Sequence, residues 1–203
     1  MLVLLVLLLW PVFLARAAPG DVEAGRQKAA ICATCHGEKG VSAMPGIPSL
    51  AGQTDQFLQW QLVFFRSGRR QSPLMSPNAA PLSDDDIRDL GAYFASLPRG
   101  AGAAGEADDG LKDKGRALAQ QHRCAACHMD DFRGQRAAPA IANQREDYLA
   151  KALQDYRSAA RPSVGVAAMT EAAARLGDED IAALAHYLAT LPQHSPGSST
   201  MAK

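Results

Sequence analysis

Apolar side chains recur at intervals of three and four residues in two stretches of the chain, residues 57–65 and residues 148–156. This spacing places them on one face of an α-helix, with polar residues on the other face. We therefore predict an amphipathic helix after Thr54 and an equivalent helix in the second half of the chain. The apolar positions are Phe57, Leu58, Leu62 and Phe65 in the first stretch and Tyr148, Leu149, Ala152, Leu153 and Tyr156 in the second.

Two further helices are predicted in each half. The first begins near Asp21, and its counterpart runs from about Leu111 to Gln121. The last helix opens at Ser83, where the hydroxyl group and Asp86 three residues later resemble a capping box, and it ends at Pro98. No stretch is typical of a strand, so the predicted fold class is all-α.

Four segments of the first half recur in the second half in the same order. Such self-similarity indicates a tandem duplication. We predict domain 1 at residues 18–98 and domain 2 at residues 111–192, joined by a small, polar linker at 99–110 and followed by a disordered tail at 193–203. The matching segments are Gly25-Arg26 and Gly115-Arg116, residues 48–53 and 139–144, residues 65–70 and 156–161, and residues 82–87 and 176–181.

Residues 1–17 have the composition of a signal peptide. An apolar run from Leu2 to Leu14 is followed by Ala15-Arg16-Ala17, which fits the small residues that signal peptidase requires. We predict cleavage after Ala17 and export to the periplasm. No Lys or Arg precedes the apolar run, which is unusual for a signal peptide, and the alternative is an uncleaved membrane anchor.

The chain is close to electrically neutral. It contains 21 Lys and Arg residues and 21 Asp and Glu residues among 203. Removal of residues 1–17 takes away Arg16 and leaves a formal charge of −1, without the basic excess that nucleic-acid binding requires. We therefore predict no nucleic-acid partner.

All four cysteines lie in two Cys-x-x-Cys-His motifs, Cys32 to His36 and Cys124 to His128. In a c-type haem site, two thiols attach one haem covalently and the adjacent imidazole binds the iron. Zinc binding would leave two histidines unused, and a redox dithiol needs no histidine. The motifs therefore predict two haem c groups and no disulfide, with Cys32, Cys35, Cys124 and Cys127 as attachment residues and His36 and His128 as iron ligands.

The sixth iron ligand is predicted from the repeat. Met75 lies seven residues before Leu82 and Met169 lies seven residues before Leu176, so both occupy the same place ahead of the last helix. Histidine and methionine ligation saturates the iron and raises its reduction potential. We expect Pro73 and Pro77 to hold the Met75 segment extended, whereas the Met169 segment has a sequence compatible with a helix. The weaker candidates are Met44, which has no counterpart, Met129 and His122, which adjoin the second motif, and His186, which aligns with Ala92.

Several residues are predicted to support the haems, each with a simpler structural alternative. The carbonyl groups of Pro48 and Pro139 are candidates to accept the N–H of the proximal imidazoles, or the prolines only form turns. Four arginines are candidates for the haem propionates or for solvated helix ends: Arg66, Arg70, Arg157 and Arg161. The apolar residues expected to face porphyrin, or simply to pack together, are Trp60, Leu62, Phe64, Leu90 and Phe94.

With these motifs, almost the whole mature chain resembles the di-haem cytochrome c4 family of class I cytochromes c. The resemblance implies two cytochrome c domains related by a pseudo-twofold axis, with propionates near the domain interface. It also implies a contact between the first and last helices of each domain, which would pair Gly25 with Tyr93 or Phe94, and Gly115 with Tyr187. The second half departs from the first at residues 129–132, where Met-Asp-Asp-Phe replaces Gly-Glu-Lys-Gly.

The predicted function is outer-sphere electron transfer in the periplasm, without catalysis of a reaction on a substrate. The resemblance implies a carrier between respiratory partners, such as a membrane cytochrome complex and a terminal oxidase. One alternative is the di-haem subunit of a flavocytochrome of the sulfide dehydrogenase type, bound to a flavoprotein. The other is a di-haem enzyme in which one iron is open. Peripheral association with the membrane also stays open.

Overall fold

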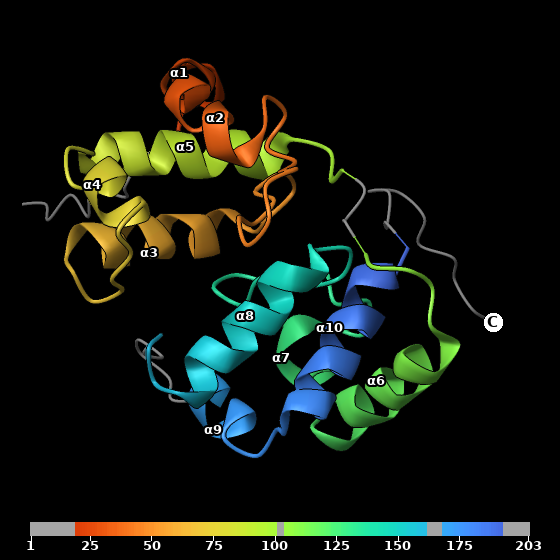
Figure 1. Ribbon diagram of the computed structural model, residues 1–203. Helices are drawn as coiled ribbons and strands as arrows, with labels where there is room; N and C mark the ends of the chain where they lie inside the picture. Colours follow the sequence, from red (N-terminus) through yellow and green to blue (C-terminus); the bar gives the residue numbers. More distant parts are fainter. Residues whose placement is uncertain (1–18, 101–103, 162–167, 193–203) are drawn as a thin grey trace, which may run out of the picture.

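The computed structural model describes residues 19–100, 104–161 and 168–192. Within these ranges the chain is helical, and its sole extended pairing is an isolated bridge between Gln135 and Ala138. The helices form two groups, one from each half of the chain (Figure 1). The all-α prediction is therefore confirmed. The predicted signal peptide and tail lie outside the described residues.

In the part of the chain that the structure describes, each half contains three longer helices and two short ones. The longer helices match the three that the sequence predicts, and the short ones carry the haem motif and the segment with the candidate methionine. In the first half the helices are α1 Val22–Lys28, α2 Ala33–His36, α3 Asp55–Arg66, α4 Met75–Ala79 and α5 Asp84–Ser96, with a 3₁₀ turn at Ala29–Ile31. In the second half they are α6 Asp109–Gln121, α7 Ala125–His128, α8 Glu146–Arg157, α9 Ala168–Ala173 and α10 Asp178–Thr190.

The helix starts follow the polar residues that the sequence places there. The Asp21 side chain accepts hydrogen bonds from the N–H groups of Glu23 and Ala24 and caps α1. Ser83 and Asp86 form the predicted capping box at α5. These contacts satisfy N–H groups that have no partner inside the helix. None of the helices in the described ranges has the length and apolar composition needed to cross a membrane.

The prediction that the Met75 segment is extended is wrong, because α4 begins at Met75. The Met75 N–H donates to the Ser72 hydroxyl at 3.1 Å, which supplies a partner at the helix start. Pro77 is the third residue of α4. Amide groups of the first turn have no partner inside the helix, so a proline there breaks no helical hydrogen bond.

The first and last helices of each half cross in backbone contact. A Cβ atom added to Gly25 would lie 2.0 Å from the Asp89 carbonyl oxygen and 2.8 Å from the Tyr93 Cβ. One added to Gly115 would lie 2.1 Å from the Ala183 oxygen and 2.5 Å from the Tyr187 Cβ. The predicted contact between glycine and aromatic residue is therefore present in both halves, with Tyr93 rather than Phe94 in the first.

Each half has its own hydrophobic core. The buried cluster of the first half contains Ala29, Leu58, Leu90 and Phe94, with Leu62 packed against it. Trp60 is 45% exposed and stacks on Phe64 instead, with ring centroids 5.6 Å apart. The core of the second half is centred on α10, and its buried members are Ala119, Phe132, Ala142, Leu149, Leu176, Ile181, Leu184, Ala185, Leu188 and Ala189.

The two halves are joined by a reciprocal pair of glutamine contacts. The Gln53 amide donates to the Ala140 carbonyl at 2.6 Å and its oxygen accepts from the Ala140 N–H at 3.0 Å. Gln144 makes the same two bonds to Ser49, at 2.8 and 2.9 Å. Gln53 and Gln144 correspond in the repeat, as do Ser49 and Ala140, so the contacts follow the twofold relation that the resemblance implies.

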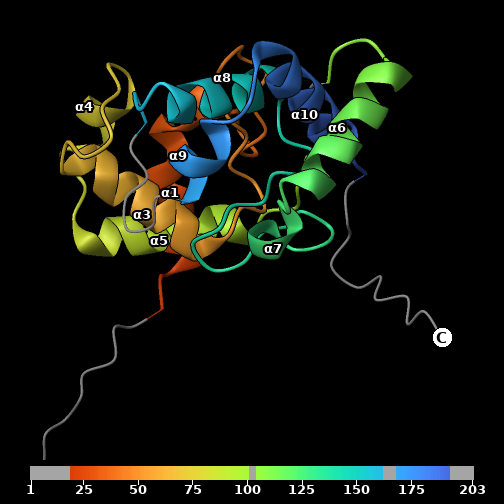
Figure 2. The same ribbon diagram turned by 90° about the horizontal axis from the view of Figure 1, so that it is seen from below.

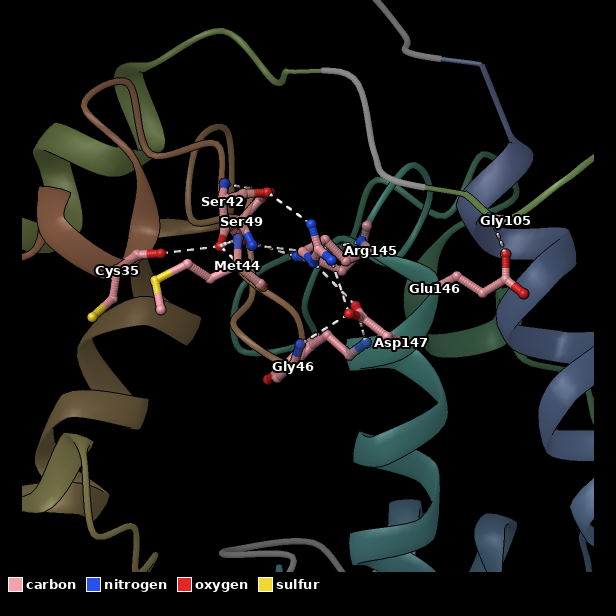
Figure 3. A network of polar contacts seen from close by, with 11 residues as sticks. Cys35, Ser42, Met44, Gly46, Ser49, Gly105, Arg145, Glu146 and Asp147 are labelled. Carbon is pink, nitrogen blue, oxygen red and sulfur yellow. Dashed lines mark hydrogen bonds and ion pairs between the residues drawn. The ribbon is translucent and has the colours of Figure 1, made fainter.

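A second set of contacts joins the start of α8 to the loop after the first haem motif (Figure 3). Arg145 donates to the Ser42 carbonyl at 3.1 Å and to the Asp147 carboxylate at 3.0 and 2.8 Å. Asp147 also accepts from the Gly46 N–H at 2.9 Å, while the Ser42 hydroxyl donates to the Cys35 carbonyl at 3.0 Å. In both ribbon views α8 lies toward the first half and α6 on the far side (Figures 1 and 2).

Candidate haem-binding sites

Both Cys-x-x-Cys-His motifs form one short helical turn that ends at the histidine. Cys32 and Cys124 stand immediately before α2 and α7, and their carbonyl groups accept from the N–H groups of His36 and His128 at 2.9 and 3.1 Å. Residues three apart on such a turn lie on the same face. The two thiols of each motif are therefore presented together beside the imidazole, as covalent attachment of one haem requires.

Each histidine is buried and held by a proline carbonyl. His36 Nδ1 lies 2.8 Å from the Pro48 oxygen, and His128 Nδ1 lies 2.8 Å from the Pro139 oxygen. A carbonyl oxygen only accepts, so Nδ1 carries the proton and donates, which leaves the Nε2 lone pair for a metal. Burial lowers the pKa of both imidazoles and favours this neutral form. The predicted role of the proline carbonyls is confirmed.

The cysteines have properties that suit attachment rather than redox chemistry between thiols. All four are free, and burial raises the pKa of the Cys32 and Cys124 thiols. A redox dithiol instead depends on a lowered thiol pKa. No group of three or more His, Cys, Asp or Glu side chains in the described ranges is arranged to hold a metal ion.

The two candidate methionines lie at equivalent places in the fold. Met75 begins α4 and Met169 is the second residue of α9, which confirms that the second segment is helical. Both side chains are half-buried. The structure thus leaves both as candidates, and their role as sixth ligands remains a prediction.

The structure weakens two rival ligands. His186 is 2% exposed, and both ring nitrogens are engaged: Nδ1 lies 3.1 Å from the Glu146 carboxylate and Nε2 accepts from the Asp108 N–H at 3.3 Å. His186, which lies on α10, therefore links two other parts of the second domain: Asp108, just before α6, and Glu146, at the start of α8. Met44 is exposed, and it belongs to the loop that contacts α8 (Figure 3).

Arg66 and Arg157 brace helix ends, which is the simpler of the two alternatives considered for them. Arg66 donates to the Leu82 carbonyl at 2.7 Å and pairs with Asp84 at 2.6 Å. Arg157 donates to the Leu176 carbonyl at 2.9 Å and pairs with Asp178 at 2.6 Å. Both arginines thus join the end of one helix to the start of the last helix of their domain.

Arg70 and Arg161 instead converge between the domains. Their guanidinium groups share the Gln61 side-chain oxygen as acceptor, at 2.5 and 3.0 Å, and Arg161 lies 3.4 Å from the Tyr148 hydroxyl. Arg161 is buried, and each guanidinium also lies over an aromatic ring. Asp155, whose charge also acts on Arg161, pairs with Lys151. Among the described residues, neither arginine forms an ion pair with a carboxylate.

This interface contains functional candidates that the sequence did not single out. The buried glutamines Gln53 and Gln144 are polar residues of a kind usually assigned to the surface. Tyr148 was expected only as an apolar helix position. The sole signal in the sequence was the recurrence of the same glutamine in segments 48–53 and 139–144.

Comparisons with known proteins agree with both the repeat and the fold. The family model described as cytochrome c matches residues 112–192, and that described as cytochrome c oxidase, cbb3-type, subunit III matches residues 22–94. A cytochrome c4 of Thiocapsa roseopersicina is 39% identical, over 87% of this chain and 97% of the relative. A thiosulfate dehydrogenase electron acceptor of Stutzerimonas stutzeri is 33% identical, over 90% and 91%.

A solved structure extends this agreement to three dimensions. The reduced recombinant cytochrome c4 from Pseudomonas stutzeri matches with a TM-score of 0.79 and 34% identity, covering 85% of this chain and all of that one. A match over 85% of the chain includes residues from both halves. The chain therefore belongs to the cytochrome c4 family and carries two covalently bound haem c groups.

Proposed function

We propose that this protein carries electrons in the periplasm between respiratory redox partners, toward a terminal oxidase. Members of the cytochrome c4 family are electron carriers rather than enzymes, and the chain belongs to that family. The observation that most supports a carrier is the matched pair of buried, neutral imidazoles, each oriented by a proline carbonyl at 2.8 Å. Periplasmic location is supported by the predicted signal peptide at residues 1–17.

In this proposal each domain provides a complete set of ligands. Cys32 and Cys35 attach the first haem, with His36 and Met75 on the iron. The corresponding residues of the second domain are Cys124, Cys127, His128 and Met169. A bound haem c supplies an iron that exchanges one electron. The ligands hold that iron closed to substrates and to water, so that electrons pass without a bond being made or broken.

We further propose that Arg70 and Arg161 attract the haem propionates at the domain interface. Two guanidinium groups share one neutral acceptor there, so carboxylates would complete the cluster. The positive charge would also favour an electron on either haem. Electrons could then pass between the domains through a fixed interface.

The pH dependence of the potentials tests this cluster. Burial alone would raise the pKa of Tyr148, but Arg161 and Arg70 outweigh it and lower that pKa to about 8. Ionisation places a negative charge at the interface and stabilises ferric iron. Propionates paired with the two arginines would offset part of this lowering of the Tyr148 pKa, so we expect the reduction potentials to fall as the pH rises above about 8, and Tyr148→Phe to abolish the fall. A spectroelectrochemical titration at several pH values measures this, and an unchanged pH profile in Tyr148→Phe would contradict it.

One relative suggests which kind of protein donates electrons to this chain. The similarity to a thiosulfate dehydrogenase electron acceptor, over about nine-tenths of both chains, supports a second candidate function: accepting electrons from an enzyme of that type. The flavocytochrome alternative requires instead a tightly bound flavoprotein.

Purification and reduction kinetics distinguish these partners. We expect the full-length haem-loaded protein to purify without flavin and to pass electrons to a terminal oxidase preparation. Rapid reduction by a purified thiosulfate dehydrogenase with thiosulfate would support the second candidate. Co-purification with a flavin-containing protein would favour the flavocytochrome role, and failure to reduce any oxidase would contradict the proposed direction.

A further inference from the structure

A single peptide group connects the proximal histidine of the first domain to the second domain. The carbonyl of the peptide between Pro48 and Ser49 accepts from His36 Nδ1 at 2.8 Å. The N–H of the same peptide donates to the Gln144 side-chain oxygen at 2.9 Å. Since Gln144 belongs to the second domain, a continuous chain of hydrogen bonds runs from that domain to the first imidazole.

The second domain has the same chain in the opposite direction. The carbonyl of the peptide between Pro139 and Ala140 accepts from His128 Nδ1 at 2.8 Å. Its N–H donates to the side-chain oxygen of Gln53, which belongs to the first domain, at 3.0 Å. The arrangement is thus crossed: each domain contacts the peptide that holds the imidazole of the other.

The glutamine side chains are fixed in the orientation that this chain needs. Gln144 and Gln53 are 3% and 5% exposed. Each amide nitrogen donates to a backbone carbonyl, at 2.8 Å for Gln144 and 2.6 Å for Gln53. A flipped amide would set its nitrogen against a backbone N–H and its oxygen against a carbonyl, so the amide oxygen must face the N–H.

Hydrogen bonds in such a chain polarise one another, so the glutamine oxygen influences the imidazole at the other end. Because the peptide bond is delocalised, an acceptor on its N–H increases the negative charge on its carbonyl oxygen. A stronger acceptor on Nδ1 makes the imidazole a more basic metal ligand. A more basic imidazole stabilises ferric over ferrous iron and lowers the reduction potential.

We infer that Gln144 and Gln53 are positioning residues that tune the haem of the opposite domain, each by strengthening the proximal imidazole through one peptide group. The inference rests on the proposed function, in which His36 and His128 are the proximal ligands. Docking of the domains thereby becomes part of what sets both potentials.

The test compares crossed variants of the full-length haem-loaded protein. Gln144→Met and Gln53→Met remove the acceptor while filling a similar volume. Spectroelectrochemical titration gives the two potentials, and hyperfine-shifted NMR resonances assign each to a domain. We expect Gln144→Met to raise the potential of the first haem and Gln53→Met that of the second, with the other haem unshifted. The imidazole N–H of the affected domain should exchange faster with solvent.

Two controls separate tuning from loosening of the interface. Thr54 donates to the Arg136 carbonyl at 2.7 Å across the same interface but contacts neither proline peptide, so Thr54→Ala should move neither potential. Gln144→Glu keeps an oxygen to accept from Ser49 and makes it a stronger, charged acceptor, so it should lower the potential of the first haem, which also provides a test if Gln144→Met does not fold.

The outcomes distinguish this inference from the ligand assignment. Equal shifts of both haems in either variant, or no shift in both, would overturn the crossed tuning. If the ring protons of His36 and His128 in the unaltered protein show no hyperfine shift, these histidines do not bind the irons. That result would overturn the ligand assignment and the tuning with it. Shifts confined to the opposite domain support both.

Discussion

Replacing Met75 by Ala is expected to open the iron of the first haem. The reduced variant should bind carbon monoxide at one haem, whereas the unaltered protein should bind none. Loss of the thioether should also lower the potential of that haem by on the order of 0.2 V, a part of the ~0.8 V range that axial ligands span. Optical titration with carbon monoxide and loss of the methionine charge-transfer absorption provide the measurement.

Two further variants make this experiment specific. Met169→Ala should have the same effect on the second haem, since Met75 and Met169 lie at equivalent places ahead of the last helix of each domain. Met44→Ala is the matched control, because its side chain is exposed and has no counterpart in the repeat. If Met44→Ala opens an iron and Met75→Ala does not, the assignment from the repeat is wrong.

The longer helices were predictable because each carries its own signals. The apolar face of α3 and the capping box of α5 lie within the segments themselves. The short helices α2 and α4 have too few residues for a periodic pattern. At the start of α4 the Ser72 hydroxyl accepts from the Met75 N–H. This contact was not predicted from the sequence, because Pro73 and Pro77 favoured an extended segment.

Residues 129–132 differ from residues 37–40 in sequence but are similar to them in backbone conformation at two positions. Met129 and Phe132 adopt φ values of 69° and 55°, in the same left-handed region as their counterparts Gly37 and Gly40, at 81° and 69°. A non-glycine residue takes this conformation at some energetic cost, which the surrounding fold must offset. The first turn after each haem motif, residues 37–40 and 129–132, therefore keeps a similar backbone conformation at these two positions in spite of the side-chain replacement.

The attachment residues and proline carbonyls could be predicted because they lie close to the motif in the chain. The glutamine contacts could not, because Gln144 meets Ser49 across 95 positions and only docking of the two domains brings them together. Likewise, the convergence of Arg70 and Arg161 on Gln61 depends on the relative placement of the domains. Sequence reasoning thus predicted the two haem motifs and their proline carbonyls, and it missed the hydrogen bonds that join the domains.

Gly115→Ala is expected to destabilise the second domain by about 3 kcal/mol, at the upper end of the usual cost of overpacking. The added methyl group would lie 2.1 Å from the Ala183 carbonyl oxygen and 2.5 Å from the Tyr187 Cβ, so α6 must move away from α10. A flexible side chain could yield, but a backbone carbonyl within a helix cannot. Gly25→Ala should have the same effect on α1 and α5, where the Asp89 oxygen lies 2.0 Å away.

Gly110→Ala, on the same helix as Gly115, is the matched control. Its added Cβ would meet only the Asp108 carboxylate, at 3.2 Å, and this side chain caps α6 by accepting from the Leu111 N–H. A small shift of that side chain would offset the preference of a helix for alanine over glycine, which is at most about 1 kcal/mol. Gly110→Ala should therefore change the stability by less than about 1 kcal/mol, far less than Gly115→Ala. Denaturant unfolding followed by circular dichroism and haem absorbance measures both. If Gly115→Ala unfolds at the same denaturant concentration as the unaltered protein, the helices do not cross in backbone contact, because helix propensity alone would favour alanine at both positions.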